Sequence, residues 1–201
     1  MLPRLPGASK TLVEEEVKRV IQNFCRESLA WRTMLYGFNI SAGNREIEVV
    51  DGDGSEREVI QIFRVYYSRR QLTPYSHTPW ETSTDHPIGW TTKTNDPSTI
   101  VLSTIPLRSY TDVIDVWAAL RPLDPTDVAA DMSLLENDFW EVIYDGALGR
   151  MFSQVEKPYM DNADAVYHLQ RYRNGTRKAR DQANRGFTGN AQNWTFPRFG
   201  R

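Results

Sequence analysis

The amino-acid sequence predicts an α+β fold: an N-terminal helix, a small antiparallel β unit of sandwich or barrel type, a C-terminal antiparallel helical hairpin and an extended C-terminal tail. Two patterns of apolar residues predict this order. Apolar residues recur every three or four positions over 11–31 and again over 134–186, as on one face of a helix, and every second position in parts of 45–120, as in half-buried strands. A chain of 201 residues can bury one good core. We therefore predict a single domain over 1–186 and a docking tail over 187–201.

The first helix is predicted to begin at a capping box, Thr11-Leu12-Val13-Glu14. In such a box the threonine hydroxyl accepts from the glutamate amide, and the carboxylate reaches back to the threonine amide. The buried stripe behind the box recurs at helical spacing: Val13, Val17, Val20, Phe24 and Ser28. Three acids in the first turn would complement the positive end of the helix dipole. We expect this helix to run to about Trp31.

The middle of the chain predicts about five antiparallel strands. Ile47 and Val49 alternate with acids, an Asp-Gly-Asp-Gly turn follows at 51–54, and a second alternating run covers 58–67. Since such glycines supply the positive φ angles of a tight turn, we predict a β-hairpin here. A long loop over 70–98 holds one strand near 88–93, and two more strands follow over 99–103 and 111–120. The last strand has one face made of Ile114, Val116, Ala118 and Leu120.

Two helices are predicted after the β unit. The first covers 134–152, and Asp161 caps the second. The stripe of the second helix has the spacing of four and three that suits an antiparallel hairpin: Ala165, Leu169, Tyr172, Thr176, Ala179 and Ala183. Gly186 is expected to end this helix. A smooth patch on the first helix, where a partner backbone can approach closely, consists of Gly146, Ala147 and Gly149.

Charge is distributed unevenly along the chain. Residues 171–201 hold eight Lys or Arg and the single acid Asp181, and the whole chain has a net charge of −2, so residues 1–170 sum to −9. Like charges gathered in one segment cost folding free energy and are usually retained for a partner. The tail also contains four aromatic residues without any periodicity: Phe187, Trp194, Phe196 and Phe199. These features indicate a hook that becomes ordered in a groove on another protein.

The basic segment leaves two other interpretations open. Its cations could contact nucleic-acid phosphates while the tail aromatics stack on bases; they are Arg171, Arg173, Arg177, Lys178, Arg180 and Arg185. The segment could also be a solvated helix end followed by a disordered terminus. Four aromatics within fifteen residues argue against that second interpretation, because disordered tails are usually poor in them.

No set of residues predicts an enzyme, and we expect neither a cofactor nor a metal ion. The single cysteine, Cys25, lies on the apolar side of the first helix, where a buried hydrophobe is expected. His77, Asp85 and His86 match no ligand spacing, although a small hydrolase using these histidines remains a third hypothesis. His168 lies within a helix without catalytic context. Asp51, Asp53 and Ser55 open like a calcium loop but lack its later glycine and glutamate.

The acids Glu136, Asp138, Glu141 and Asp145 belong to a charge run that is typical of a solvated or partner-facing surface. The sequence lacks the glycine-rich motifs of nucleotide-binding proteins and serine hydrolases. A secretory signal and an apolar run long enough to span a bilayer are also missing. We therefore expect a soluble protein made in the cytoplasm, with no membrane contact.

Several segments resemble the head-to-tail adaptor (connector) proteins of tailed bacteriophages. The resemblance covers nearly the whole chain except 68–98, and its motifs are structural rather than catalytic. It rests on Leu5-Pro6-Gly7-Ala8-Ser9, Phe24-Cys25-Arg26-Glu27, Ala118-Ala119-Leu120-Arg121-Pro122, Asp145-Gly146-Ala147-Leu148-Gly149-Arg150-Met151, Lys157-Pro158-Tyr159 and Ala179-Arg180-Asp181-Gln182-Ala183-Asn184-Arg185-Gly186-Phe187.

The resemblance implies a virion structural protein, made in the host cytoplasm, that forms a twelvefold ring beneath the portal protein at the head–tail junction. Such a ring extends the DNA channel and seats a tail or neck protein, which the β unit would face. The implied portal-binding residues are Arg185, Phe187, Trp194, Phe196, Arg198 and Phe199. Subunits would touch through Gly146, Ala147 and Gly149, and the acidic stretch 124–164 would meet Arg173, Arg177 and Arg180 of a neighbour. Contact between basic side chains and packaged DNA in the channel stays open.

Overall fold

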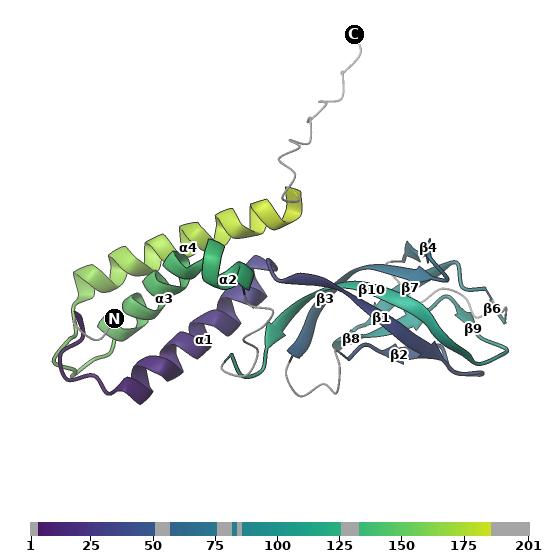
Figure 1. Cartoon of the computed structure of the whole chain (residues 1–201), viewed down its shortest axis with the longest axis horizontal. Helices are drawn as coiled ribbons and strands as arrows, with labels where there is room; N and C mark the ends of the chain where they lie inside the picture. The colour runs from purple at the N-terminus through teal and green to yellow at the C-terminus, as the bar shows by residue number, and fades with distance from the viewer. Residues whose placement is uncertain (1–3, 51–56, 76–81, 84–85, 126–132, 186–201) are drawn as a thin grey trace, which may run out of the picture.

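The computed structural model describes residues 4–50, 57–75, 82–83, 86–125 and 133–185. The helices gather at one end of an elongated molecule and the strands at the other, with α4 lying along the outer edge of the helical end (Figure 1). Four helices form that end: α1 (Lys10–Ser28), α2 (Ser133–Asp138), α3 (Trp140–Phe152) and α4 (Asn162–Arg185). The predicted α+β class, with an N-terminal helix, an antiparallel-rich β unit and a C-terminal helical pair, is confirmed.

The first helix is capped two residues before the predicted capping box. Ser9 is the N-cap, its hydroxyl accepts from the Leu12 amide at 3.2 Å, and no acid lies in the first turn. Leu5, which is buried with Val13 against the helical end, holds the chain just before this cap. The prediction of a Thr11 cap was therefore wrong because tertiary packing selected between two similar caps. The helix also ends earlier than predicted, at Ser28, where Leu29 takes the left-handed conformation (φ 52°).

The strands form two four-stranded sheets and one parallel pair. The first sheet has the order β1-β10-β3-β4, the second β2-β8-β7-β5, and the pair is β6-β9. The bounds are β1 (Arg32–Ile40), β2 (Glu46–Glu48), β3 (Arg57–Tyr67), β4 (Arg70–Gln71), β5 (Thr73–Pro74), β6 (Thr82–Ser83), β7 (Gly89–Lys93), β8 (Asp96–Leu102), β9 (Thr104–Ile105) and β10 (Tyr110–Pro122). The predicted strands near 88–93, 99–103 and 111–120 correspond to β7, β8 and β10.

The predicted hairpin between β2 and β3 does not form. β2 pairs with β8, with Ile47 opposite Ile100, whereas β3 pairs with β10 and belongs to the other sheet. The alternating pattern correctly located both strands, but alternation reports burial of one face and says nothing about the hydrogen-bonded neighbour. The turn residues 51–54 lie outside the described residues.

The strand β1 was not predicted, because the predicted β unit began at residue 45. Its burial does not alternate cleanly, since the pairing with β10 shifts register between Leu35 and Phe38. Gly37 lies in that irregularity with φ +79°, a conformation that side chains other than glycine rarely adopt. A bulge of this kind interrupts the period of two on which the prediction depended.

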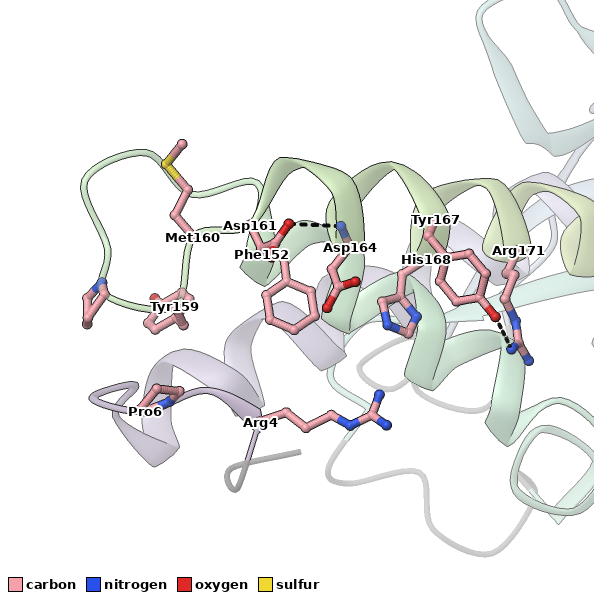
Figure 2. Close-up of a pocket in the computed structure, with 11 residues that line it drawn as sticks. Arg4, Pro6, Phe152, Tyr159, Met160, Asp161, Asp164, Tyr167, His168 and Arg171 are labelled. Atoms are coloured by element: carbon pink, nitrogen blue, oxygen red, sulfur yellow. Dashed lines mark hydrogen bonds between the residues drawn. The ribbon is translucent and has the colours of Figure 1, made fainter.

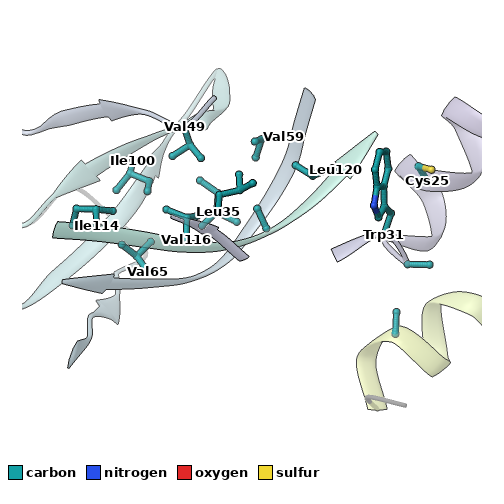
Figure 3. Packing of buried hydrophobic residues seen from close by; sticks show 14 of the residues in the cluster. Cys25, Trp31, Leu35, Val49, Val59, Val65, Ile100, Ile114, Val116 and Leu120 are labelled. Atoms are coloured by element: carbon teal, nitrogen blue, oxygen red, sulfur yellow. The ribbon is translucent and has the colours of Figure 1, made fainter. Parts of the chain in front are cut away.

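The two sheets pack face to face around apolar side chains (Figure 3). Val49 and Ile100 come from the second sheet and its margin, and they face side chains of the first, including Ile114 and Val116. The same buried cluster continues through Trp31 into the helices, where it includes Cys25 of α1 and residues of α3 and α4. Helices and strands therefore share one continuous core.

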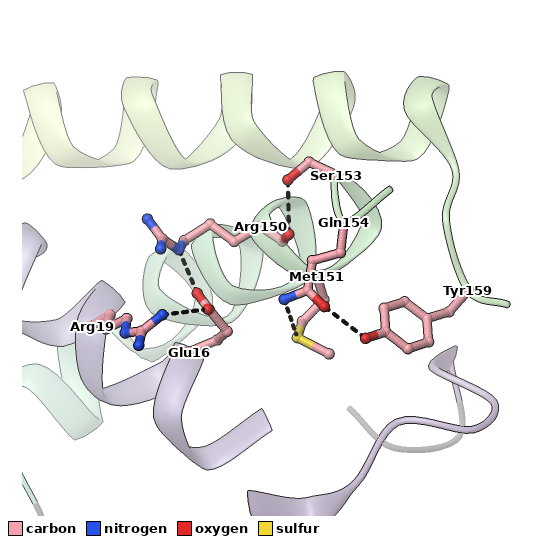
Figure 4. Close-up of polar contacts among 7 residues, drawn as sticks. All are labelled: Glu16, Arg19, Arg150, Met151, Ser153, Gln154 and Tyr159. Atoms are coloured by element: carbon pink, nitrogen blue, oxygen red, sulfur yellow. Dashed lines mark hydrogen bonds and ion pairs between the residues drawn. The ribbon is translucent and has the colours of Figure 1, made fainter. Parts of the chain in front are cut away.

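An ion cluster that the sequence did not indicate joins α1 to α3. The Glu16 carboxylate is buried and accepts from Arg150 Nε at 2.6 Å and from Arg19 Nη1 at 3.0 Å (Figure 4). Tyr159 donates to Gln154 nearby, at 2.7 Å. Glu16 lies on the same side of α1 as buried Val13 and Val20, and Arg150 supplies the counter-charge that its burial requires.

Candidate interaction surface on the last helix

The last helix, α4, is built as the sequence predicted. The Asp161 carboxylate accepts from the amides of Ala163 and Asp164 at 2.9 and 3.1 Å and so caps the helix. The predicted stripe faces inward, with Ala165, Thr176, Ala179 and Ala183 buried. The preceding helix differs from the prediction of one helix over 134–152, because Phe139 leaves helical geometry and separates α2 from α3. Its ring packs on Phe24 of α1, with centroids 5.3 Å apart.

The glycine patch predicted for a neighbouring subunit lies inside the monomer. Gly146, Ala147 and Gly149 are all buried. A Cβ atom on Gly146 would lie 2.6 Å from the Tyr172 ring, and one on Gly149 would lie 2.9 Å from the backbone nitrogen of Leu169. These residues let α3 approach α4 within one chain, so they are not available as an exposed subunit contact.

A third glycine, Gly175, completes this seam from the α4 side, where a Cβ atom would lie 2.6 Å from Val142 Cγ2. We call the contact of Gly146, Gly149 and Gly175 with the facing helix the glycine seam. A signal for Gly175 was present in the sequence. Glycine in a helix interior costs about 1 kcal/mol relative to alanine, and its retention in mid-helix indicates a packing requirement.

A buried polar cluster fastens α3 to α4 beside the seam. Asp145 and His168 are both buried, and Asp145 Oδ1 lies 2.7 Å from His168 Nδ1. Arg171 Nε approaches Asp145 Oδ2 at 2.8 Å. The hydrogen bond that Arg171 donates to the Tyr167 hydroxyl, followed by the charge of Asp145, raises the pKa of Arg171. One acid of the predicted acidic run and one cation of the basic run are thus paired within the chain.

A cavity of about 630 Å³ opens at the end of the helices beside His168 (Figure 2). Its lining has mixed charge, with Arg4 and Arg171 opposite in sign to Asp161 and Asp164. An aspartate that holds Nδ1 of a histidine is also the orienting half of a catalytic dyad. Among the described residues that line the cavity there is no Ser, Thr or Cys to serve as the nucleophile. The Asp145–His168 pair is therefore interpreted as a structural contact between α3 and α4.

The outer flank of α4 carries cations that are not paired. Arg173, Arg177 and Arg180 are exposed, and no acid among the described residues forms an ion pair with any of them. We call these three residues the basic flank. A groove of about 340 Å³ runs along it, lined by Val166, Leu169, Gln170, Arg173, Asn174 and Arg177. Val166 contributes a largely exposed apolar floor, with 65% of its surface accessible.

Arg32 of β1 fixes the end of this helix. Its guanidinium donates to the Ala183 carbonyl and to Asn184 Oδ1, both at 2.8 Å, and lies 4.2 Å above the ring of Phe63. Burial, followed by the charge of Arg180, lowers the pKa of Arg32. The arginine therefore satisfies a terminal carbonyl of α4 and holds the end of this helix against β1. Nothing in the sequence indicated this long-range cap.

Of the predicted portal-binding residues, the structure places Arg185, which is exposed at the end of α4. The others, Phe187, Trp194, Phe196, Arg198 and Phe199, lie outside the described residues. Arg171 is separated from the basic flank, since it pairs with Asp145.

The remaining candidate sites are the possible metal ligands, the histidines of the 70–98 loop and Cys25. The described part of the chain brings together no three His, Cys, Asp or Glu side chains suited to a metal ion. His86 is exposed next to the Tyr67 ring, with centroids 6.2 Å apart, while His77 and Asp85 lie outside the described residues. Burial raises the pKa of the Cys25 thiol to about 12, so the reactive thiolate is suppressed. None of the described helices is long and apolar enough to cross a bilayer.

Comparison with known proteins yields no assignment. No protein-family description matches this chain. No curated protein matches it either.

Proposed function

We propose that this chain is a non-enzymatic virion structural protein, a ring-forming adaptor between the portal and the tail or neck of a tailed bacteriophage, which extends the DNA channel. The observation that carries the proposal is the basic flank, three exposed arginines without acidic partners in the described residues, on the helix that leads into the aromatic tail. The resemblance of the sequence motifs to head-to-tail adaptors supports the same function.

The arginines of the basic flank have no acidic partner among the described residues. Two other arginines of the helical end, Arg150 and Arg171, are paired with Glu16 and Asp145. The basic flank repels itself and Arg32, which favours a partner that supplies acids or carbonyl oxygens. Beyond it, aromatic residues next to arginines have the composition of interface anchors. We assign portal binding to Arg185, Phe187, Trp194, Phe196, Arg198 and Phe199.

The test is binding to the portal protein of the same phage. The full chain, a chain ending at Gly186, and a full-length variant with Phe187, Trp194, Phe196 and Phe199 changed to Ala would each be mixed with portal rings. Cryo-electron microscopy and sedimentation would then show whether a ring assembles under the portal. We expect a ring with the full chain and none with either altered chain. A full chain that does not bind the portal, or an altered chain that binds as well as the full one, would contradict the proposal.

The basic flank also favours a second function, nucleic-acid binding. Three arginines that each neutralise one phosphate would give a slope of about −2.7 in log affinity against log salt concentration on duplex DNA. Measuring DNA binding of the full chain between about 50 and 200 mM salt tests this. Binding that weakens along this slope, and is lost when Arg173 and Arg177 are changed to Glu, would favour the nucleic-acid function. Affinity that does not change with salt would exclude it.

A further inference from the structure

The helical end exposes a tryptophan that does not line the groove of the basic flank. Trp140, the first residue of α3, has 54% of its surface accessible, and the edge of its ring contacts Tyr144 one turn later, with centroids 6.3 Å apart. Asp138 and Glu141 on either side are exposed and have no ion-pair partner among the described residues. We call Asp138, Trp140 and Glu141 the acidic knob. An exposed tryptophan between unpaired acids has the composition of an interface anchor with a charged rim.

The acidic knob and the basic flank carry complementary features. The knob offers one large exposed ring with an acid on either side of it in the sequence, and the flank offers a groove lined by the apolar Val166 together with Arg173 and Arg177. The groove volume of about 340 Å³ is at the lower end of the range for ligand sites, roughly 300–1,000 Å³. It therefore suits a side chain better than a cofactor-sized molecule. Arginines at the rim can also stack on an indole ring.

Helix geometry shows that the two surfaces face different ways. Glu141 precedes Asp145 by one turn on the same face of α3, and Asp145 pairs with Arg171 of α4. Arg171 and Arg173 are two residues apart, so they point about 200° from each other around the helix. Glu141 therefore lies toward the Arg171 side of the α3–α4 pair, whereas Arg173 and the groove lie on the opposite flank of α4, and Trp140 does not line that groove. The Trp140 of a chain does not reach its own groove while α3 and α4 stay packed through the glycine seam.

We propose that Trp140 of one copy docks into the Val166–Arg173–Arg177 groove of the next copy, with Asp138 and Glu141 pairing with the arginines. This contact rests on the proposed ring and identifies the surfaces through which neighbouring subunits touch. It is heterologous, because two different surfaces meet and each copy retains one free knob and one free groove. Such contacts repeat from copy to copy and close into a ring when the rotation suits. The occupant is a second copy, because its knob supplies an aromatic ring for Val166 and carboxylates for both arginines.

The experiment uses the full chain and three variants. Trp140→Ala removes the ring of the knob, and Arg173→Glu with Arg177→Glu inverts the groove charge. Lys178→Glu is a control that reverses one charge on α4 outside the groove lining. Sedimentation and native mass spectrometry would follow self-association up to about 1 mM, so that even a contact with a millimolar dissociation constant is detected. We expect each of the first two variants to weaken self-association by about thirtyfold or more, as for hot-spot residues, and Lys178→Glu to resemble the unmodified chain.

Mixing the two weakened variants provides the decisive result. The groove of the Trp140→Ala chain is intact and so is the knob of the double variant, so the mixture contains one functional contact per pair. We expect one-to-one dimers of the two variants that grow no further. A mixture that stays monomeric, an unmodified chain that is monomeric at about 1 mM, or a Trp140→Ala chain that assembles normally overturns the inference.

Portal binding separates this inference from the proposed function. Self-association through knob and groove without portal binding would leave the contact in place and refute the adaptor function. A portal-bound ring that forms equally well with Trp140→Ala would leave the adaptor function in place and refute the contact. Circular dichroism of each variant controls for folding, because all the altered side chains are exposed and should leave the monomer intact.

Discussion

Replacing Gly149 with alanine tests whether the glycine seam lies within the monomer. The added methyl group would lie 2.8 Å from Leu169 Cγ and 2.9 Å from the Leu169 backbone nitrogen. A side chain can rotate out of the way, but a backbone nitrogen in the middle of α4 cannot. The two helices therefore have to move apart by several tenths of an ångström along their contact, which loosens packing at every position of the seam.

Two effects of opposite sign set the magnitude. At an exposed helix position, Gly to Ala stabilises by about 1 kcal/mol because the unfolded chain loses freedom. Overpacking a close-packed contact costs about 1–3 kcal/mol, and a rigid backbone neighbour favours the upper part of that range. We expect a net loss of about 1–2 kcal/mol, which lowers Tm by roughly 2–8 °C for a chain of this size.

Thermal unfolding followed by far-ultraviolet circular dichroism measures the effect. Asn174→Ala is the matched control, because Asn174 is exposed on α4 and gains helix propensity without a clash. The reasoning is refuted if Gly149→Ala raises Tm as the control does. That outcome, together with weakened self-association, would restore the glycine patch as a surface between subunits.

Three further outcomes follow from the contacts. Glu16→Ala should lower the free energy of unfolding in urea by about 1–3 kcal/mol. This is less than the roughly 3–5 kcal/mol expected for breaking a fully buried pair, because Arg150 and Arg19 can rehydrate. Glu15→Ala, at an exposed position, is the control, and equal losses for the two variants would contradict the role of the ion cluster. Arg32→Lys should speed amide hydrogen exchange at residues 183–185, because the end of α4 loses its hydrogen bonds to the guanidinium. Unchanged exchange would show that Arg32 does not hold the end of the helix. Burial keeps the Cys25 thiol protonated in the folded state but not in the unfolded state, so the free energy of unfolding should fall as pH rises from 9.0 toward about 12. A Cys25→Ala chain should lack the part of this decline that is due to the thiol. Identical pH profiles of the two chains would contradict this prediction.

Local patterns predicted the helices and most strands because each depends on burial of one face. The stripe over Ala165, Thr176, Ala179 and Ala183 faces inward, and every member of the predicted face of β10, from Ile114 to Leu120, is buried. The Asp161 cap is also local, with both of its hydrogen bonds within three residues. Such features depend on neighbours in the sequence, so the sequence contains enough information to predict them.

The wrong or missing predictions concern partners that are distant in sequence. Alternation cannot choose between β8 and β3 as the neighbour of β2. The start of α1 depended on the packing of Leu5, and the cap of α4 depends on Arg32, which is 151 residues from Ala183. The basic flank was predicted as a set of cations, but the pairing that leaves Arg173 unpaired and Arg171 paired becomes visible only in three dimensions.

The pairing inside the monomer decides which charges remain for a neighbour. A general attraction between the acidic stretch 124–164 and a basic last helix does not distinguish the chain from its neighbour, because part of that attraction is already satisfied within one copy. Asp145 holds His168 and Arg171, and Asp161 caps its own helix. Among the described residues of this stretch, the exposed acids that remain are Asp138, Glu141, Glu156 and Asp164, and the first two flank the exposed Trp140 in the sequence. Charge reversal at Asp138 and Glu141 should therefore weaken self-association, and the same reversal at exposed Glu156, outside the knob, should not. Equal effects at both places would mean that net charge alone, rather than this contact, drives assembly.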